Sequence, residues 1–202
     1  SGTIAIEAAQ VACGVAPGLL RSNAFERLLP FASSAAEWQQ LKAAAKARVH
    51  PSAVPIFASD VSFRMVDFAR RNAERAGVAH AIEFKTADAL QRPPPAAAGT
   101  LIMNPPYGER IAPKGQGQGQ GQPPSREGFE GGADAGAFFA ALAGHWKRHY
   151  GGWTAWCLSP EMKLPSLMRL KESRRVPMWN GAIECRLFRF DLVTGSHREP
   201  GR

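Results

Sequence analysis

The sequence predicts an α/β fold, a doubly wound and mostly parallel β-sheet flanked by helices and ending in an antiparallel β-hairpin. Segments with helical spacing of apolar residues alternate with short apolar strands along the chain, as in successive parallel βα units. Several of these strands end in polar residues. Asn180-Gly181 lies between two strand-like runs and is a strong hairpin signal.

Composition favours one sizeable globular domain. The chain has 202 residues, 45% of them apolar and 21% charged, which argues against general disorder. A net charge of +8 and a pI near 9.9 favour a polyanionic partner such as RNA or DNA, although a surface tuned for solubility carries the same charge.

Three cysteines lie far apart without a Cys-X-X-Cys pair, so we expect buried thiols in a reducing compartment. No apolar run reaches the length of a membrane span, and the first residues lack the basic leader of a signal peptide. We therefore expect a cytoplasmic protein with no membrane partner.

Apolar residues at helical spacing predict a first helix that begins within the first few residues, with Gly14 and Pro17 ending the run. An α/β domain normally has a strand before such a helix, and we expect this strand in a longer parent chain. Residues 18–50 are irregular to helical, and the helix in this stretch would turn Trp38, Leu41 and Ala45 inward.

Strands are predicted at 54–60, 81–88 and 99–104, with an amphipathic helix at 63–77 whose inward residues are Met65, Val66, Phe68, Ala69 and Ala73. Beyond a flexible Gly/Gln insert at 114–132 we expect a helix at 133–150, a strand at 153–159, a short helical stretch at 160–170 interrupted by Pro165, and the hairpin.

Ligands of open α/β sheets lie beyond the carboxyl ends of the strands. Polar or glycine residues occupy such positions four times in this sequence: Gly2-Thr3, Asp60, Asp88 and Asn104-Pro105-Pro106-Tyr107. Each has a plainer interpretation. Asp60 would cap the helix near Phe63, and Gly2 would only permit close packing.

These motifs resemble those of the class I S-adenosylmethionine-dependent methyltransferases, within them the RNA methylases that carry an upstream THUMP domain. "NPPYGER" (104–110) together with "NGAIECRLFRFDL" (180–192) is similar to the ribosomal large-subunit guanine-N2 methyltransferases. The resemblance covers most of the chain. It implies a Rossmann-like class I fold over residues 1–202 with the first strand missing, and guanine N2 of 23S rRNA as the target.

The sequence departs from the family pattern in four places. One is the upstream THUMP domain, which we expect in the longer parent chain. The acid, proline and glycine that precede "SGT" in the family are absent, Ser62 stands where a second acid is common, and a Gly/Gln insert replaces a charged segment.

The resemblance also implies a binding site for S-adenosyl-L-methionine. Ser1, Gly2 and Thr3 would lie near its methionine part, because a helix N-terminus suits a carboxylate. Asp60 would accept hydrogen bonds from the ribose hydroxyls and Asp88 from the adenine amine. The full set of implied cofactor residues is Ser1, Gly2, Thr3, Asp60, Val61, Asp88, Ala89 and Asn104.

Asn-Pro-Pro-Tyr suits methylation of an exocyclic base amine, whose lone pair is delocalised into the ring. The Asn104 side-chain carbonyl and the Pro105 backbone carbonyl would accept its two hydrogens and favour a pyramidal nitrogen. Pro106 holds Pro105 extended, and Tyr107 offers a face for an unstacked base. Rate would come from positioning rather than from a strong base.

Arg110 and Lys114 flank this motif and are predicted to contact RNA phosphates. The clusters "HWKRHY" (145–150) and "KESRR" (171–175) favour solvated helix faces over RNA contacts. His145 and His149 share a helical face but have no evident third ligand, so no metal is expected.

Three alternatives stay open at this point. Asn-Pro-Pro-Tyr also serves adenine-N6 methylation of DNA or RNA. Methylation of a protein glutamine amide uses the same motif, although Gly108 stands where a bulky aliphatic residue is usual. A non-catalytic RNA-binding module fits the charge but does not explain Asp60, Asp88 and Asn104.

Overall fold

The structure is a computed structural model that describes residues 1–105 and 132–194, with the backbone alone described for 132–135. The chain divides into two compact units, unit 1 (residues 1–88) and unit 2 (residues 89–202). The order of helices and strands along the chain is the predicted one, and the α/β class is confirmed.

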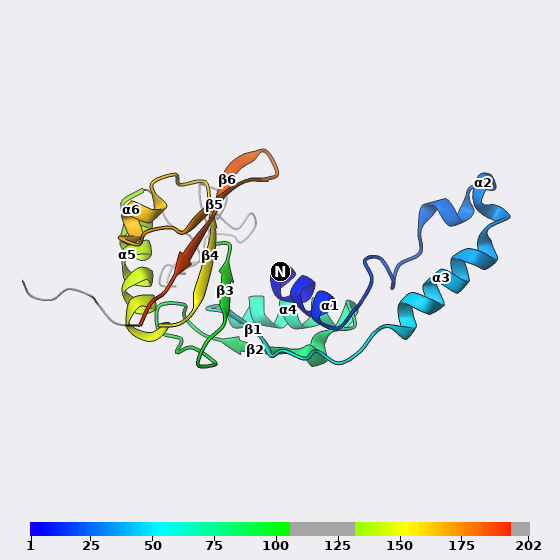
Figure 1. Ribbon diagram of the computed structural model, residues 1–202, viewed down its shortest axis with the longest axis horizontal. Helices are drawn as coiled ribbons and strands as arrows, with labels where there is room; N and C mark the ends of the chain where they lie inside the picture. Colours follow the sequence, from blue (N-terminus) through cyan, green and yellow to red (C-terminus); the bar gives the residue numbers. More distant parts are fainter. Residues whose placement is uncertain (106–131, 195–202) are drawn as a thin grey trace, which may run out of the picture. The chain divides into compact units, whose positions relative to one another are not determined.

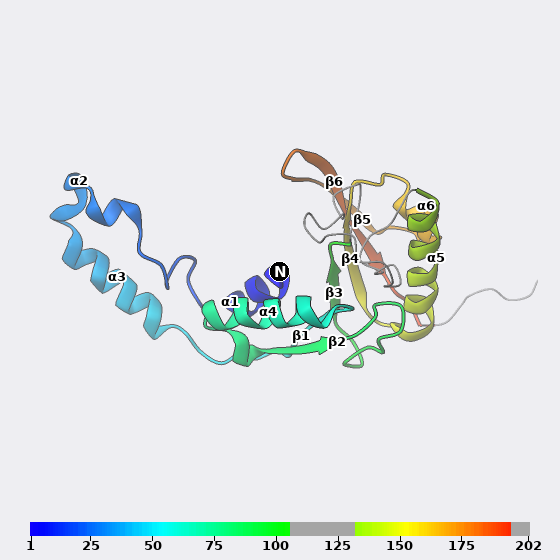
Figure 2. The same ribbon diagram turned by 180° about the vertical axis from the view of Figure 1, so that it is seen from behind.

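Unit 1 is built on a parallel pair of strands. These are β1 (Ile56–Asp60) and β2 (Ile82–Thr86), with Ile56 opposite Ile82. Helices α1 (Thr3–Ala12) and α4 (Phe63–Arg75) lie on the same side of the pair (Figures 1 and 2). The buried core between these elements consists of aliphatic side chains without an aromatic ring: Ala9, Ala73, Val78 and Ile82.

The buried stripe of α4 is narrower than predicted. Val66, Ala69 and Ala73 are buried at helical spacing, whereas Phe68 is 39% exposed. The prediction that Phe68 points inward is therefore wrong. A layer of only two strands offers little surface to cover, and a stripe of small side chains is enough to cover it.

Between α1 and β1 unit 1 carries a helical segment that consists of η1 (Ala24–Arg27), α2 (Leu29–Ala32) and α3 (Ala35–Ala47). Phe25 packs edge-on against Phe31 and Trp38, with ring centroids 5.4 and 5.0 Å apart. Leu41, predicted to face inward, is 58% exposed, and Leu29 is 89% exposed. Trp38 packs against Phe25 of the same helical segment. The predicted inner face of α3 is therefore not buried as a whole.

Unit 2 holds a four-stranded mixed sheet in the order β3-β4-β6-β5. Its strands are β3 (Thr100–Met103), β4 (Thr154–Ser159), β5 (Arg174–Asn180) and β6 (Ile183–Asp191). β3 and β4 are parallel, and β6 runs antiparallel to both β4 and β5. Helices α5 (Gly132–His149) and α6 (Leu164–Met168) lie on one face of this sheet (Figure 1).

The core of unit 2 is large and aromatic. Trp146, Phe188 and Phe190 are fully buried, and Phe139 and Trp153 pack in the same cluster. Gly99 precedes β3 at a point where an added Cβ would lie 2.8 Å from the Trp153 ring, so only glycine lets β3 begin against this core.

Two details of unit 2 differ from the sequence interpretation. Asn180 pairs with Ile183, so the predicted hairpin is confirmed but its turn residues are Gly181 and Ala182. Pro165 lies in the first turn of α6 rather than interrupting it, because proline at the start of a helix removes no hydrogen bond that the helix needs.

Within residues 1–105 and 132–194, no helix is long and apolar enough to cross a membrane. The Gly/Gln insert predicted at 114–132 lies outside the described residues, except for Gly132, which is the first residue of α5.

Candidate active site

Asp60 and Asp88 lie at the same edge of unit 1. Asp60 is the last residue of β1 and pairs with Thr86, the last residue of β2. Asp88 follows two residues later, and the Ala87 amide donates to the Asp60 carbonyl over 2.9 Å. Because the strands are parallel, both acids stand at their carboxyl ends, where α/β sheets bind ligands.

The Asp60 carboxylate is held by the backbone of the turn into α4. Its Oδ1 accepts a hydrogen bond from the Ser62 amide over 2.9 Å. Ser62, not Asp60, caps α4, since its hydroxyl accepts from the Met65 amide. The simpler interpretation of Asp60 as a helix cap is therefore wrong. Val61 is 46% exposed beside it.

The N-terminus of α1 is pressed against α4. Gly2 has φ 76°, and an added Cβ would lie only 2.7 Å from the Ala69 Cβ. The Ser1 carbonyl accepts from the Asn72 side chain over 2.9 Å, and the Thr3 hydroxyl donates to the Ser1 hydroxyl. Close packing explains Gly2 directly, and the first amides of α1 have no partner within the helix.

Asn104 and Pro105 follow β3 in unit 2, as predicted. The Asn104 side chain is exposed, whereas Pro105 is buried. This contrast gives an amide that is open to a ligand, followed by a rigid residue that is buried. Pro106, Tyr107, Arg110 and Lys114 lie outside the described residues.

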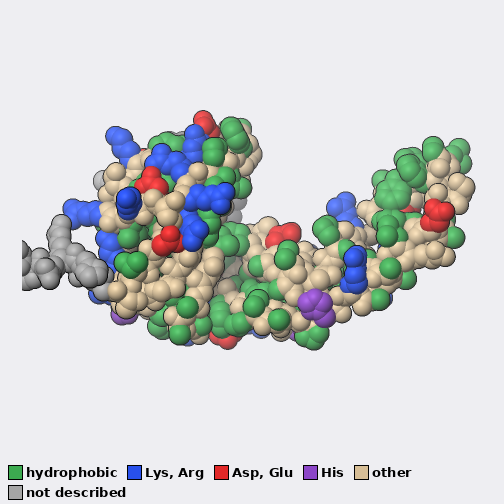
Figure 3. Space-filling model, in the orientation of Figure 1, with side chains coloured by type: hydrophobic (Ala, Val, Ile, Leu, Met, Phe, Trp, Pro, Cys, Tyr) green, Lys and Arg blue, Asp and Glu red, His purple; other side chains and the backbone are tan. Residues whose placement is uncertain are grey.

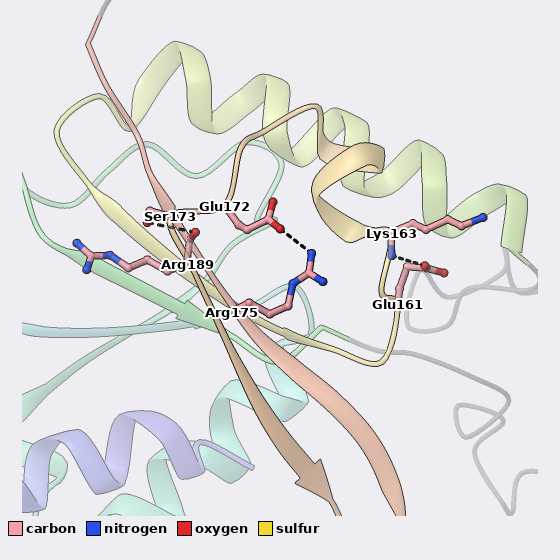
Figure 4. Close-up of polar contacts among 6 residues, drawn as sticks. All are labelled: Glu161, Lys163, Glu172, Ser173, Arg175 and Arg189. Carbon is pink, nitrogen blue, oxygen red and sulfur yellow. Dashed lines mark hydrogen bonds and ion pairs between the residues drawn. The ribbon is translucent and has the colours of Figure 1, made fainter.

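Ser159 and Glu161 lie at the sheet edge that carries Asn104, because β4 is parallel to β3 and ends at Ser159. The buried Ser159 hydroxyl accepts from the Glu161 amide over 3.1 Å, and the exposed Glu161 carboxylate accepts from the Lys163 amide (Figure 4). Sequence reasoning did not single out these residues. Their signal was the same as that of Asn104, a polar residue after an apolar strand.

The first segment of unit 2, which follows Asp88, is fixed to the C-terminal end of α5 by two side chains. His145 Nε2 and the Tyr150 hydroxyl both lie within hydrogen-bond distance of the Arg92 carbonyl, at 2.8 and 3.0 Å. Ala89, at the start of this segment, is exposed. Burial raises the pKa of Tyr150, so the hydroxyl keeps the proton that it donates.

The solvated helix faces that the sequence favoured for the charge clusters are confirmed in part, since Lys147, Arg148 and His149 are exposed in the last turn of α5. The other residues differ from this prediction. In 145–150, His145, Trp146 and Tyr150 are buried, because they face the core of unit 2. In 171–175, Arg174 and Arg175 belong to strand β5. Among the described residues no group of three or more His, Cys, Asp or Glu side chains is placed to hold a metal ion.

Unit 1 carries acids at the carboxyl ends of its parallel strands, and unit 2 carries Asn-Pro after β3. Both are positions at which α/β domains bind ligands. The family described as "RMKL-like, methyltransferase domain" matches residues 1–119. This is more than half of the chain, and the chain belongs to that family.

Curated relatives match nearly the whole chain. The ribosomal RNA large subunit methyltransferase K/L of Shewanella baltica (strain OS185) is 38% identical over 203 residues, which cover 98% of this chain and 26% of the relative. The protein of the same name from Shewanella loihica is 37% identical with the same coverage. The chain thus spans about a quarter of the length of the curated relatives it matches.

Solved structures share the fold. The crystal structure of SMU.472, complexed with SAH, has a TM-score of 0.77 at 21% identity and covers 97% of this chain and 46% of that one. A possible methylase from Clostridium difficile 630 has the same TM-score at 24% identity, covering 99% and 46%. At this identity the likeness concerns the fold, and it confirms the predicted Rossmann-like class I arrangement.

Proposed function

We propose that this protein transfers a methyl group from S-adenosyl-L-methionine to an exocyclic base amine in RNA, with guanine N2 of 23S rRNA as the target. The family is one of methyltransferase domains, and the curated relatives are named as large-subunit rRNA methyltransferases. The observation that carries the proposal is the end of β3, where an exposed Asn104 side chain is followed by a buried Pro105.

The proposed reaction needs acceptors more than it needs a base. The amine nitrogen attacks the methyl carbon of the sulfonium, the carbon–sulfur bond breaks with its electron pair going to sulfur, and the charged amine then loses a proton to water. The Asn104 amide oxygen and the Pro105 carbonyl would accept the two amine hydrogens and stabilise the positive charge that develops. Burial of Pro105 fixes where its carbonyl stands.

The carboxyl edge of unit 1 supplies groups suited to the cofactor. Within residues 1–105 and 132–194 the Asp60 carboxylate accepts a hydrogen bond through Oδ1, from the Ser62 amide, and Oδ2 would accept from the ribose hydroxyls. The exposed Val61 offers apolar surface beside it. Asp88, with Ala89 next to it, would accept from the adenine amine, and the α1 N-terminus, with Ser1, Gly2 and Thr3, would face the carboxylate of the methionine part. SAH, the demethylated form of this cofactor, is bound in the SMU.472 structure.

The finer parts of the sequence interpretation belong to this proposal. Pro106 and Tyr107 would complete the acceptor motif, and Arg110 and Lys114 would contact the RNA backbone. An upstream THUMP domain is expected on the same resemblance, and a cytoplasmic location is expected because the cysteines suit a reducing compartment.

The test is Asn104→Ala in the whole chain. We expect methyl transfer to fall about 100-fold or more, the size of effect seen when one transition-state hydrogen-bond partner is removed, while the dissociation constant for S-adenosylmethionine changes little. Gln40→Ala removes an exposed amide from α3 and serves as the control with wild-type activity. Full activity of Asn104→Ala contradicts the proposed mechanism.

Product analysis separates the proposed target from the alternative. Mass spectrometry of digested RNA should show N2-methylguanosine, whereas N6-methyladenosine would support adenine-N6 methylation with the same acceptor pair. The motif does not distinguish these two amines, because each is planar and carries two hydrogens.

A further inference from the structure

Half of the excess positive charge of the chain is concentrated in residues 169–189 of unit 2. Residues 169–189 contain six arginines and lysines against two glutamates, which is four of the eight excess charges of the whole sequence. In Figure 3 blue side chains predominate over red ones on the visible face of unit 2. A stretch this basic creates a local positive potential.

Two arginines of the hairpin stand directly opposite one another. Arg174 of β5 pairs in register with Arg189 of β6, so their side chains share one face of the sheet. The next pair is Arg175 and Phe188, and Phe188 is fully buried in the core. Arg174 and Arg189 therefore lie on the face turned away from α5 and α6. Like charges in directly opposite positions repel each other, and in the described residues Asp191 pairs with only one of the two, Arg189.

The carboxylates of this region are already engaged. Glu172 pairs with Arg175 at 2.5 Å and Glu184 pairs with Arg186 at 2.8 Å. Asp191 pairs with Arg189 at 2.9 Å. In Figure 4 the Arg175 side chain turns toward Glu172, whereas Arg189 points away from that pair. Among the residues the structure describes, Arg169, Lys171 and Arg174 form no ion pair with a carboxylate, although Lys171 lies close enough to Glu172 to help lower the pKa of that carboxyl.

Arg169 adds a second, independent sign of function. It ends α6 with φ 48°, and it is the only residue other than glycine with positive φ in residues 1–105 and 132–194. Glycine or asparagine is the usual choice in this conformation. The backbone conformation at this position favours glycine, so an exposed arginine here is kept at a cost in backbone strain.

We propose that Arg169, Lys171, Arg174 and Arg189, the cationic surface, bind backbone phosphates of RNA. The choice of RNA rests on the proposed function, since a methyl-accepting RNA must be held while one base is presented. The Arg189 guanidinium carbon lies 5.8 Å from the centroid of the Trp156 ring. Contacts with this ring and with Asp191 limit the rotamers of Arg189 and hold its guanidinium in position for a phosphate. Phosphate contacts of this kind set register without reading sequence.

The experiment compares two double variants with the same loss of charge. Lys171→Gln/Arg174→Gln removes two exposed cations from the cationic surface. Lys46→Gln/Arg48→Gln removes one lysine and one arginine, both exposed, from the end of α3 in unit 1. Binding of a short fluorescein-labelled single-stranded RNA is measured by anisotropy over a series of KCl concentrations without cofactor, and melting curves check folding.

For Lys171→Gln/Arg174→Gln we expect RNA binding about tenfold weaker or more at low salt, and a slope of log K against log salt that is shallower by about one for each lost phosphate contact. The α3 variant should stay within about twofold of the wild type. Equal losses in both variants, or no loss in the first, overturn the proposal; retained RNA affinity would point to an acidic protein partner instead.

Arg169→Gly keeps the test independent of folding. Glycine adopts φ 48° without a Cβ penalty, so this variant should melt at the same temperature or higher while RNA binding weakens. A purely structural role for Arg169 predicts unchanged binding. Methylation is assayed separately. If the wild type binds RNA through the cationic surface but does not methylate it, only the proposed function is contradicted. If every variant methylates RNA normally and binds it with unchanged affinity, only this inference is contradicted.

Discussion

The hydrophobic cores of unit 1 and unit 2 are built from different kinds of side chain. Unit 1 covers a two-stranded layer with alanines and single aliphatic side chains, whereas unit 2 buries tryptophan and phenylalanine rings under a four-stranded sheet. Burial free energy scales with the apolar area removed from water. We therefore expect unit 2 to contribute most of the free energy of unfolding. The edge that holds Asp60 and Asp88 belongs to unit 1, which we expect to be the less stable unit.

The largest expected effect is on the core of unit 2. Phe188→Ala should lower the free energy of unfolding by about 3–5 kcal/mol, since Phe188 is fully buried. Phe84→Ala, which removes a half-buried ring from unit 1, should cost about 1–2 kcal/mol. Urea unfolding followed by circular dichroism measures both. A larger loss for Phe84 would reverse the comparison.

A smaller effect is expected where α1 meets α4. Gly2→Ala meets both a positive φ and an Ala69 contact at 2.7 Å, and should cost about 2–3 kcal/mol. Gly181→Ala has φ 63° but open space around the added methyl, so it serves as the matched control at about 1 kcal/mol. Hydrogen exchange should show faster opening in unit 1 alone for Gly2→Ala; faster exchange in both units would mean that they open together.

Alkaline pH should weaken unit 2 through its buried thiol. Burial raises the pKa of Cys157 from 9.0 to about 12. The unfolded chain releases this proton above pH 9 and the folded chain keeps it, so stability falls as pH rises from 9 toward 12, by about 1.4 kcal/mol per pH unit. Cys157→Ala removes this contribution, and its unfolding free energy should fall less steeply between pH 9 and 10. Identical pH dependence of both proteins would exclude the thiol as the cause.

The smallest effect concerns the segment after Asp88. Tyr150→Phe removes one of the two groups that hold the Arg92 carbonyl, and His145 still reaches it. We expect a loss of about 1 kcal/mol, together with a modest rise in the dissociation constant for S-adenosylmethionine measured by calorimetry. His145→Phe should do more than Tyr150→Phe only if the histidine is the main donor.

The sequence predicted those features that leave a local pattern. Helical and strand periodicity located α1, α4 and α5 and the strands, and polar residues after apolar runs located Asp60, Asp88 and Asn104 at strand ends. Contacts between distant residues leave no such pattern. The attachment of Arg92 to His145 and Tyr150, 53 and 58 residues away, is of this kind, and so is the register that sets Arg174 opposite Arg189.

The two errors in side-chain orientation have the same origin. Phe68 and Leu41 fit the apolar stripes of α4 and α3 in the sequence, but burial requires a partner surface, and none of sufficient width covers them. Periodicity identifies which side of a helix is apolar. It does not show which surface, if any, packs against that side.

The helical segment of unit 1 has a practical consequence for anyone who assays this protein. Leu28, Leu29 and Phe31 are exposed over neighbouring positions, a surface of the kind that binds anilinonaphthalene dyes in partly folded proteins. The native chain should therefore give dye fluorescence of its own. A rise in that signal during heating has to be judged against this native baseline before it is taken as melting.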